Sequence, residues 1–239
     1  VEKESVEPES EAVFYSAVLT GLYRSSLPAV PVHIFSATDY GTGKSFAAQV
    51  VSVTIEGHRV PATSPGSDVT ETEKRLGSMM LAGAPVVVVD NVEDPITGKF
   101  WCSAVTEAIS TVRILGSSNT VKIPNRTFFM VTGFNVKVGR DMCRRSLLCE
   151  IDPCVENPEL RKFDFDPVQE ALAERPQTVA AGLTMLRWAQ VHLDELPPVQ
   201  PLGSFEAWGI VRRVLMYAGL PDPVITQEAI RNEDPTREA

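Results

Sequence analysis

Short apolar runs alternate with longer amphipathic segments along most of this chain. The apolar runs lie at residues 32–35, 85–90, 127–132 and 147–151, and each has the length and the Val, Ile and Phe content of a buried strand. The segments between them repeat apolar residues at helical spacing. Because buried strands that alternate with helices form parallel sheets, the pattern predicts an α/β fold whose parallel sheet is flanked by helices.

Helices are expected around these runs at residues 12–23, 45–55, 70–81 and 100–109. The third opens with Thr70, whose hydroxyl stands three residues ahead of Glu73, the spacing of a capping box. Residues 112–115 and 120–123 flank the turn sequence G-S-S-N. This arrangement predicts a β-hairpin just before the third strand.

The chain becomes helical from Pro167 onward. One apolar stripe there holds Val179, Leu183, Leu186 and Leu193, and another holds Phe205, Trp208, Val211, Leu215 and Ala218. Both stripes predict packing surface rather than cofactor contact.

Charge and cysteine content narrow the class of protein. The 239 residues hold 22 Lys and Arg against 31 Asp and Glu, a formal net charge of −9, which argues against a surface coated in nucleic acid but not against DNA held locally by a few basic residues. No apolar run approaches the roughly 20 residues of a membrane span, and the glutamate-rich start has no signal core. The four cysteines form no C-x-x-C pair. We therefore expect a cytoplasmic protein with reduced thiols, and the first residue, Val1, suggests a piece of a longer chain.

The turn after the first strand has the residue types of a phosphate-binding loop. Gly41 and Gly43 permit backbone angles that turn successive N–H groups toward phosphate oxygens, and the helix that follows directs its positive end at the same anion. Lys44 reaches β- and γ-phosphate oxygens, and the Ser45 hydroxyl is a ligand for Mg²⁺. We therefore expect Mg-ATP in a cradle of Thr38, Asp39, Tyr40, Gly41, Thr42, Gly43, Lys44, Ser45 and Phe46. Thr38 replaces the first glycine of G-x-x-x-x-G-K-[ST], and the alternative is a chance match in a surface loop.

A carboxylate follows the second strand, where a Walker B residue is expected. Asp90 ends V-V-V-V-D-N and is the second candidate ligand, with Ser45, for the Mg²⁺ site. The next residue is Asn91, an amide that orients water but takes no proton. Glu93 and Asp94 are alternative candidates for the base. Alternatively, the strand simply stops at a turn-forming Asp-Asn pair, and Asp90 is not a Walker B residue.

Polar and basic residues also follow the third strand. Asn135 stands in the sensor position, where a side chain hydrogen-bonds the γ-phosphate or the attacking water. Arg144 and Arg145 come shortly after it, and a guanidinium from a neighbouring subunit stabilises charge on a transferred phosphoryl group. A solvated arginine pair is the alternative. The catalytic candidates are thus Lys44, Asp90, Asn91, Asn135, Arg144 and Arg145.

In their order along the chain these segments resemble the ATPase domain of prophage and mobile-element primase–helicases, related to superfamily 3 helicases within the AAA+ group. The carrying segments are Y-G-T-G-K-S, L-A-G-A-P-V-V-V-V-D-N-V, V-R-I-L-G-S-S, I-P-N-R-T-F-F-M-V-T-G-F-N, D-M-C-R-R-S-L-L-C-E-I-D-P, P-E-L-R-K-F and L-G-S-F-E-A-W, and they span residues 32–223. The chain then divides into an acidic linker or frayed start at 1–11, a P-loop NTPase (AAA+-like) core with a preceding helix at 12–166, and a C-terminal helical subdomain at 167–239.

The resemblance implies a homo-oligomeric ring, with a hexamer favoured, that binds ATP between subunits and acts on single-stranded or forked DNA. It implies that Arg144 or Arg145 acts on a neighbour's nucleotide, and it suggests a linked or associated primase module, which these residues do not contain. The family's DNA-gripping hairpin corresponds to residues 112–123 here, with Arg113, Lys122 and Arg126 as phosphate contacts. The sequence departs from the family at Phe134, where such sensors often have Asn, and at the hairpin tip, which has no lysine.

An ATP-driven motor domain of a phage or mobile-element helicase is the leading functional hypothesis. Asn91 and the acidic composition keep open an ATP-gated assembly module that hydrolyses ATP weakly. A small-molecule P-loop kinase is the third hypothesis, and it predicts a monomer with an acceptor pocket.

Overall fold

The computed structural model describes residues 7–114, 119–155, 157–161 and 164–234. The expected acidic start over residues 1–6 and most of the expected hairpin tip lie outside these ranges.

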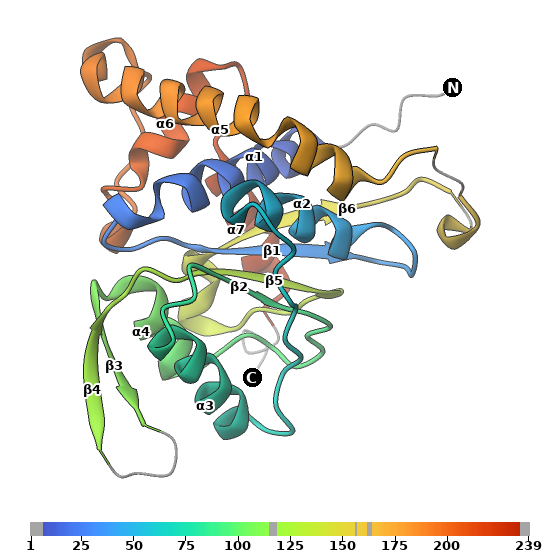
Figure 1. Ribbon diagram of the computed structural model, residues 1–239, viewed down its shortest axis with the longest axis vertical. Coiled ribbons are helices and arrows are strands. Elements are labelled where there is room, and N and C mark those ends of the chain that lie inside the picture. The colour runs from blue at the N-terminus through green and yellow to red at the C-terminus, as the bar shows by residue number, and fades with distance from the viewer. Residues whose placement is uncertain (1–6, 115–118, 156, 162–163, 235–239) are drawn as a thin grey trace.

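A four-stranded parallel sheet forms the centre of the molecule, as the sequence predicts (Figure 1). Its strands are β1 (Val32–Ala37), β2 (Val86–Val89), β5 (Phe128–Phe134) and β6 (Ser146–Ile151), in the order β2-β5-β1-β6. Strand β5 therefore pairs with both β1 and β2, with Ala37 opposite Phe134 and Val89 opposite Val131. All four carboxyl ends meet at one edge of the sheet, which we call the carboxyl edge, and the opposite one the amino edge.

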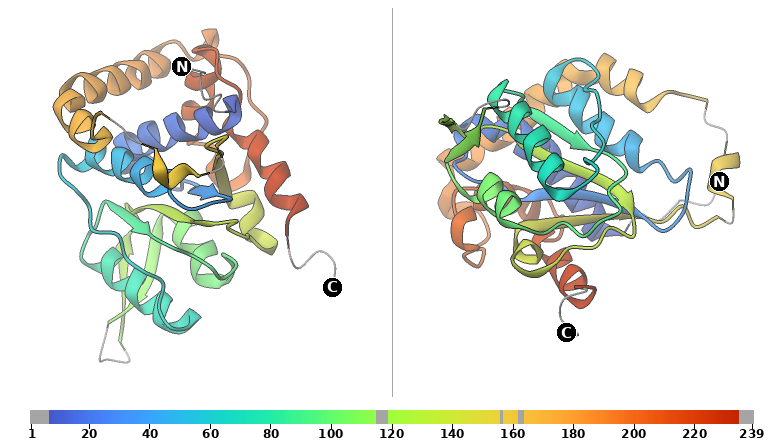
Figure 2. Two further views of the ribbon diagram at one scale, coloured as in Figure 1. Left: turned by 90° about the vertical axis from the view of Figure 1, so that its right-hand side faces the viewer. Right: turned by 90° about the horizontal axis from the view of Figure 1, so that it is seen from below.

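Helices cover both faces of this sheet (Figures 1 and 2). Their bounds are α1 (Pro8–Tyr23), α2 (Lys44–Glu56), α3 (Val69–Leu81) and α4 (Lys99–Thr106). Helices α1 and α2 lie on one face and α3 and α4 on the other. The apolar residues of the strands, such as Ile34, Met130 and Leu147, are fully buried between these layers. The α/β fold with a parallel sheet flanked by helices is therefore confirmed.

Three predicted helix boundaries are wrong for local reasons. Helix α1 begins at Pro8 rather than at residue 12, because proline suits the first turn of a helix and Glu9 and Glu11 complement its positive end. Helix α3 begins at Val69, since the carboxylate of Asp68, and not the Thr70 hydroxyl, accepts a hydrogen bond from the backbone N–H of Glu71. Helix α4 ends at Thr106, and Ile109 belongs to the hairpin.

The predicted hairpin is present, with strands β3 (Ile109–Arg113) and β4 (Thr120–Pro124). It leads directly into the amino end of β5 and stands away from the sheet, at the lower left of Figure 1. Its buried face, which includes Ser110 and Val112, packs toward α3. The base of the hairpin is thus tied to the amino edge.

The chain after Pro167 is helical, with α5 (Pro167–Val191), α6 (Gly209–Tyr217) and α7 (Thr226–Asn232). Short 3-10 turns complete the described chain at Arg24–Ser26, Arg140–Arg145, Pro158–Leu160, Leu193–Glu195, Gly203–Phe205 and Pro223–Ile225. Helix α5 packs on α1, α2 and α6.

The two C-terminal apolar stripes behave differently. The second is buried at Phe205, Trp208, Val211 and Leu215, although Ala218 is exposed. The first is wrong as a buried face, because Leu183 and Leu193 are 44% and 46% exposed. Helix α5 instead buries Gly182, Leu186 and Ala189, where Gly182 lets the helix approach Leu19 and Leu22 of α1 closely.

Two further expectations concern the environment of the chain. Among the described residues, no helix combines the length and the apolarity that crossing a membrane requires. All four cysteines are free thiols, at positions 102, 143, 149 and 154.

Candidate functional site

The turn that joins β1 to α2 has the glycine backbone angles that the predicted phosphate-binding loop requires. Gly41 and Gly43 have φ angles of 69° and 99°, in the left-handed region that glycine adopts at little cost. A Cβ atom on Gly43 would meet no atom within 4 Å, so the backbone angle rather than crowding requires glycine there. Helix α2 then begins at Lys44, which places the positive end of the helix at the loop.

The side chain of Lys44 lies inside this loop and is only 7% exposed. Its Nζ atom sits 3.4 Å above the centroid of the Phe134 ring, a cation–π contact, and the Tyr40 ring packs on Phe134 with centroids 4.3 Å apart. Burial lowers the pKa of Lys44, while the nearby charge of Asp90 raises it. The Phe134 ring therefore holds the Lys44 ammonium at this turn.

Asp90 lies close to the turn after β1 because β5 lies between β1 and β2 and all three strands end at the same edge of the sheet. The Ser45 hydroxyl donates to Asp90 Oδ1 at 3.1 Å, and the Thr132 hydroxyl donates to the same oxygen. A serine hydroxyl and a carboxylate at this separation are hard oxygen ligands of the kind that Mg²⁺ takes with its waters. The residues present thus fit a magnesium ion held between Ser45 and Asp90.

The other predicted cradle residues line or flank the same turn. Thr38, Asp39, Tyr40, Gly41 and Phe46 are exposed, whereas Thr42 is buried. The Thr42 hydroxyl has no hydrogen-bond partner among the described residues, and such a buried polar atom costs stability unless a ligand or water satisfies it. Thr38 also borders a separate hollow of about 590 Å³, together with Glu150 and Asp152.

Asn91 and Asn135 follow β2 and β5 in the same unusual conformation. Their φ angles are 55° and 43°, the left-handed region in which asparagine is enriched among residues other than glycine. Asn91 borders a cavity of about 260 Å³ with Glu93 and Asp94, the alternative bases, so all three face one space. Asn135 is exposed, and its backbone N–H donates to Ala37 O at 3.1 Å.

Gly133 is a residue that the motif search did not single out. A Cβ atom there would lie 2.4 Å from the backbone oxygen of Val92. Only glycine lets the chain after Asp90 cross this close to β5, where the Val92 N–H donates to Thr132 O at 2.9 Å. The T-G-F-N sequence carried this signal, since a glycine inside a strand indicates a close approach of backbone.

Arg144 and Arg145 lie at the amino edge, away from the phosphate loop of their own chain. They precede β6, whose first residue Ser146 pairs with Val32 at the start of β1, while the loop follows Ala37 at the end of β1. Five residue steps separate these ends, roughly 17 Å along the strand. The structure therefore does not bring the two arginines to the turn after β1 in the same chain.

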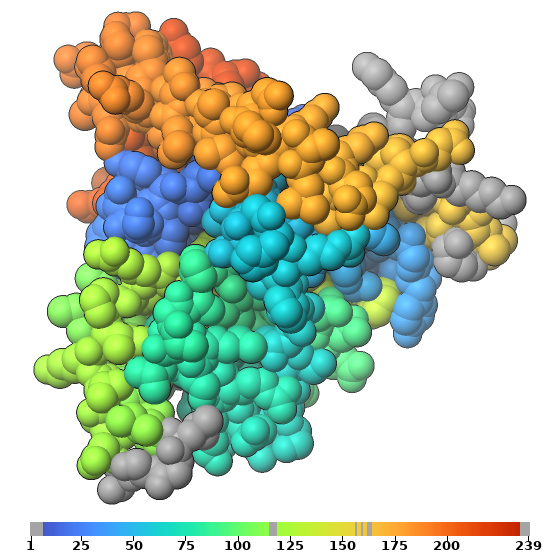
Figure 3. Space-filling view, viewed as in Figure 1, coloured from blue at the N-terminus to red at the C-terminus, as the bar shows by residue number. Residues whose placement is uncertain are grey.

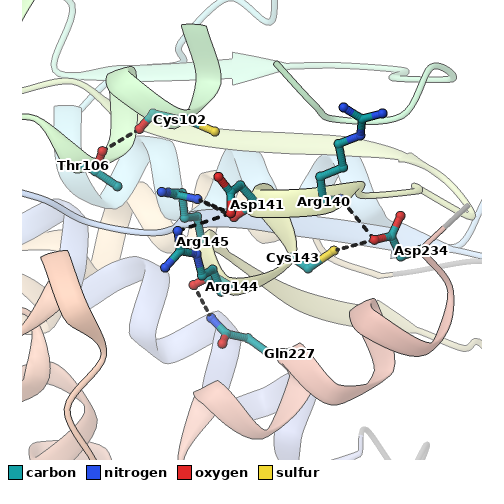
Figure 4. A network of polar contacts seen from close by, with 9 residues as sticks. All are labelled: Cys102, Thr106, Arg140, Asp141, Cys143, Arg144, Arg145, Gln227 and Asp234. Carbon is teal, nitrogen blue, oxygen red and sulfur yellow. Dashed lines mark hydrogen bonds and ion pairs between the residues drawn. The ribbon is translucent and has the colours of Figure 1, made fainter. Parts of the chain in front are cut away.

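Both arginines contact Asp141 within the 3-10 turn (Figure 4). Arg144 pairs with the Asp141 carboxylate at 3.2 Å and its side chain is 59% exposed. Arg145 donates to the Asp141 backbone oxygen at 2.6 Å, and its side chain is 14% exposed. Arg145 borders a cavity of about 450 Å³ together with Lys99 and Arg140, two cations that the motif search did not identify.

The predicted DNA-contacting residues lie on or beside the hairpin. Strand pairing places Lys122 opposite Thr111 and Arg113 opposite Thr120, and all four are exposed. Residues paired in this way share one face, so Arg113 and Lys122 are diagonal neighbours on the outward face. Arg126 is exposed at the base of the hairpin. In Figure 3 the hairpin strands, yellow-green, and the phosphate-loop segment, blue, lie on opposite sides of the molecule.

A buried arginine fixes the base of this hairpin. Arg24 donates to the backbone oxygens of Thr127 at 2.9 Å, Asn125 at 2.7 Å and Leu27 at 2.5 Å. Burial, and to a smaller extent the charge of Arg126, lowers its pKa to about 10. Local sequence patterns do not predict this role, because two of the three partners, Thr127 and Asn125, lie about a hundred residues away along the chain.

Comparisons with known proteins support the fold only. No model of a protein family matches the chain, and no curated protein matches it. Among solved structures, the chain is similar to the apo A form of the NrS-1 C-terminal region, at 12% identity and a TM-score of 0.50 over 96% of this chain and 66% of that one. Another structure of that region gives 13% identity and a TM-score of 0.43, over 96% and 64%. This chain thus spans just under two thirds of the region it resembles.

Proposed function

We propose that this chain binds Mg-ATP at the carboxyl edge and hydrolyses it as the motor domain of a phage or mobile-element helicase or primase–helicase. The observation that carries the proposal is the meeting of three groups at one loop. The buried Lys44 ammonium, the Ser45 hydroxyl and the Asp90 carboxylate come from two strand ends, and Ser45 lies 3.1 Å from Asp90. Together they supply a phosphate contact and two magnesium ligands.

The chain's own residues divide the work of binding and hydrolysis. The loop N–H groups and Lys44 hold the phosphates, and Ser45 and Asp90 hold the magnesium ion, which neutralises charge on the γ-phosphoryl. Asn135 orients the γ-phosphate or the attacking water, and Asn91, with Glu93 and Asp94 in the same cavity, faces the water. In this proposal the fold likeness to the NrS-1 C-terminal region supports the core and carries no activity across.

The proposal includes a homo-oligomeric ring, with a hexamer favoured by the family resemblance, and the position of the arginines supports assembly. Arg144 and Arg145 lie at the amino edge, so these two guanidinium groups reach a nucleotide at the carboxyl edge only from a neighbouring subunit. The hairpin with Arg113 and Lys122 then meets single-stranded or forked DNA inside the ring.

The test is ATP hydrolysis at several protein concentrations, with and without single-stranded DNA, beside the Lys44→Ala variant. The proposal predicts turnover per subunit that rises with protein concentration and with DNA, and that is lost in the variant. Turnover that is independent of concentration and DNA would favour a monomeric kinase-like enzyme instead.

A second candidate is an ATP-gated assembly module, and the conformation of Asn91 favours it. A glutamate at this left-handed position would cost about 1 kcal/mol, so the backbone itself disfavours the usual general base. This candidate predicts ATP-dependent assembly with phosphate release that DNA does not accelerate in a single turnover. Faster release with DNA present excludes it.

A further inference from the structure

Helix α7 and the two residues after it contact the segment that carries the arginines (Figure 4). We call residues 137–145 the arginine segment; the start of β6 follows it. Five hydrogen bonds join the arginine segment and β6 to residues 226–234. Three lie after α7: Lys137 Nζ donates to Glu233 at 2.7 Å, and the Arg140 N–H and the Cys143 thiol donate to Asp234 at 3.1 Å and 3.7 Å. Two lie on α7: Gln227 Nε2 donates to Arg144 O at 2.9 Å, and the Leu148 N–H donates to Thr226 Oγ1 at 3.2 Å. Residues 226–234 therefore brace the arginine segment along its length.

Gln227 is the central contact of this brace. Its side chain is buried at 1% exposure, and its Nε2 donates to the backbone oxygen of Arg144. Its Oε1 accepts from Arg231 at 3.4 Å on the next turn of α7. Because a buried amide without partners costs about 1–3 kcal/mol, this contact fixes the backbone of Arg144 relative to α7.

Asp234 holds the other end of the arginine segment. Arg140 has a φ of 55°, a left-handed conformation that costs a residue other than glycine about 1 kcal/mol. The hydrogen bond from its N–H to the Asp234 carboxylate stabilises that conformation. Burial and the Asp234 charge raise the pKa of Cys143, so its thiol stays protonated at neutral pH and donates to Val138 O at 3.4 Å and to Asp234.

The contacts of Gln227 and Asp234 hold the backbone of the arginine segment and do not involve its guanidinium groups. The Arg140 side chain extends away from Asp234 in Figure 4, and Arg144 and Arg145 contact Asp141. We propose that Gln227 and Asp234 are positioning residues that present the arginine segment to the γ-phosphate of a nucleotide on a neighbouring subunit. This inference rests on the proposed ring ATPase and adds the element that sets the geometry of its shared site.

The test compares Gln227→Leu and Asp234→Asn with Gln177→Leu, a matched change at an exposed position of α5. ATP affinity and turnover are measured separately in the full chain, by titration with a fluorescent ATP analogue and by steady-state hydrolysis. Because a misplacement of about 1 Å costs a shared site up to about 100-fold, we expect turnover to fall by about tenfold or more in the first two variants, with ATP affinity within about twofold of wild type. Gln177→Leu should match wild type in both.

Mixing subunits separates positioning from misfolding. A Gln227→Leu subunit keeps an intact phosphate loop, and a Lys44→Ala subunit keeps an intact arginine segment, so a mixed ring contains complete shared sites. We expect the mixture to hydrolyse ATP faster than either variant alone. Asp234 follows α7 and is partly exposed, and Asp234→Asn therefore repeats the test without opening the core.

Three outcomes overturn the inference, and they are distinguishable from failure of the proposed function. The positioning role is excluded if both variants keep wild-type turnover, or if their ATP affinity falls together with turnover. It is also excluded if the mixture hydrolyses ATP no faster than either variant alone. In each case the wild-type chain would still be a concentration-dependent ATPase. Wild-type chain that fails to bind ATP, or that hydrolyses it independently of concentration, would overturn the proposed function and the inference together.

Discussion

The two edges of the central sheet each hold a buried cation, and the surroundings of these two cations differ. At the amino edge Arg24 donates to three backbone oxygens, and the buried ring of His33 contacts Ser16 Oγ at 2.7 Å and Pro31 O at 3.2 Å. At the carboxyl edge Lys44 rests on a ring, and the buried Thr42 hydroxyl has no partner among the described residues. Hydrogen bonds within the chain therefore engage the Arg24 guanidinium in stabilising the fold, whereas the Lys44 ammonium meets a ring face and is the cation that the proposed function assigns to phosphate.

The largest effect is expected from removing the guanidinium of Arg24. Arg24→Met keeps the apolar stem but leaves the oxygens of Thr127, Asn125 and Leu27 without their donor, which should cost at least about 3 kcal/mol of unfolding free energy. Thermal denaturation should show a Tm lower by about 6–12 °C. The control is Arg126→Met at an exposed neighbouring position, expected within about 0.5 kcal/mol of wild type. Equal Tm values for the two variants would show that the hydrogen bonds of Arg24 do not stabilise the fold.

The next largest effect is expected at Lys44, and on binding rather than stability. Lys44→Ala removes a charge-assisted contact to phosphate, so the affinity for Mg-ATP should fall by about 10–100-fold, or about 1.5–3 kcal/mol. Isothermal titration measures the Mg-ATP affinity of this variant and of the control Lys99→Ala, which changes a lysine near the arginine segment. Affinity lost equally in both variants would contradict the assignment of the nucleotide to the carboxyl edge.

Acid should destabilise the fold through His33. Burial lowers the pKa of His33 from 6.5 to about 3, outweighing the opposing effect of the Pro31 carbonyl, so the unfolded chain takes up a proton before the folded chain does. Its contribution to stability is present above pH 6.5 and is lost as the pH falls from 6.5 toward 3. Between pH 7 and pH 5 the loss should reach about 2 kcal/mol.

Urea unfolding of wild type, His33→Gln and His58→Gln at both pH values measures this loss. His58 has a 70% exposed side chain and serves as the control. The pH dependence should shrink in His33→Gln and persist in His58→Gln. A His33→Gln variant with the wild-type pH dependence would show that other groups cause it.

The smallest effect is expected on the outward face of the hairpin. Lys122→Ala removes one exposed cation, so the affinity for single-stranded DNA should fall about two- to fivefold, and the slope of log affinity against log salt should lessen by about 0.7. Fluorescence anisotropy at several salt concentrations measures both. Thr111→Ala, which changes the directly opposite residue without charge, should leave the salt slope unchanged. An unaltered slope in Lys122→Ala would remove this residue from the DNA contact.

Local sequence signals predicted the strands, the hairpin and the turn at Gly41 to Ser45, because these depend on apolar runs and on glycine next to one another in the chain. They did not predict that β5 separates β1 from β2, since strand order depends on packing across the whole sheet. The same limit applies to the contacts of Arg24 with Thr127 and of Gln227 with Arg144, which join residues about 80 to 100 positions apart. The capping error at Thr70 arose because Asp68 competes for the same N–H groups with a charged oxygen.

The backbone angles of Asn91 and Asn135 also bear on how this sequence can diverge. Asparagine, aspartate and glycine enter the left-handed region readily, whereas other residues do so at about 1 kcal/mol or more. In a lineage descended from this chain, we expect drift at both positions to remain within those three residue types. A gain of an acid beside Asp90 would then arrive as aspartate at position 91, with a shorter reach than glutamate.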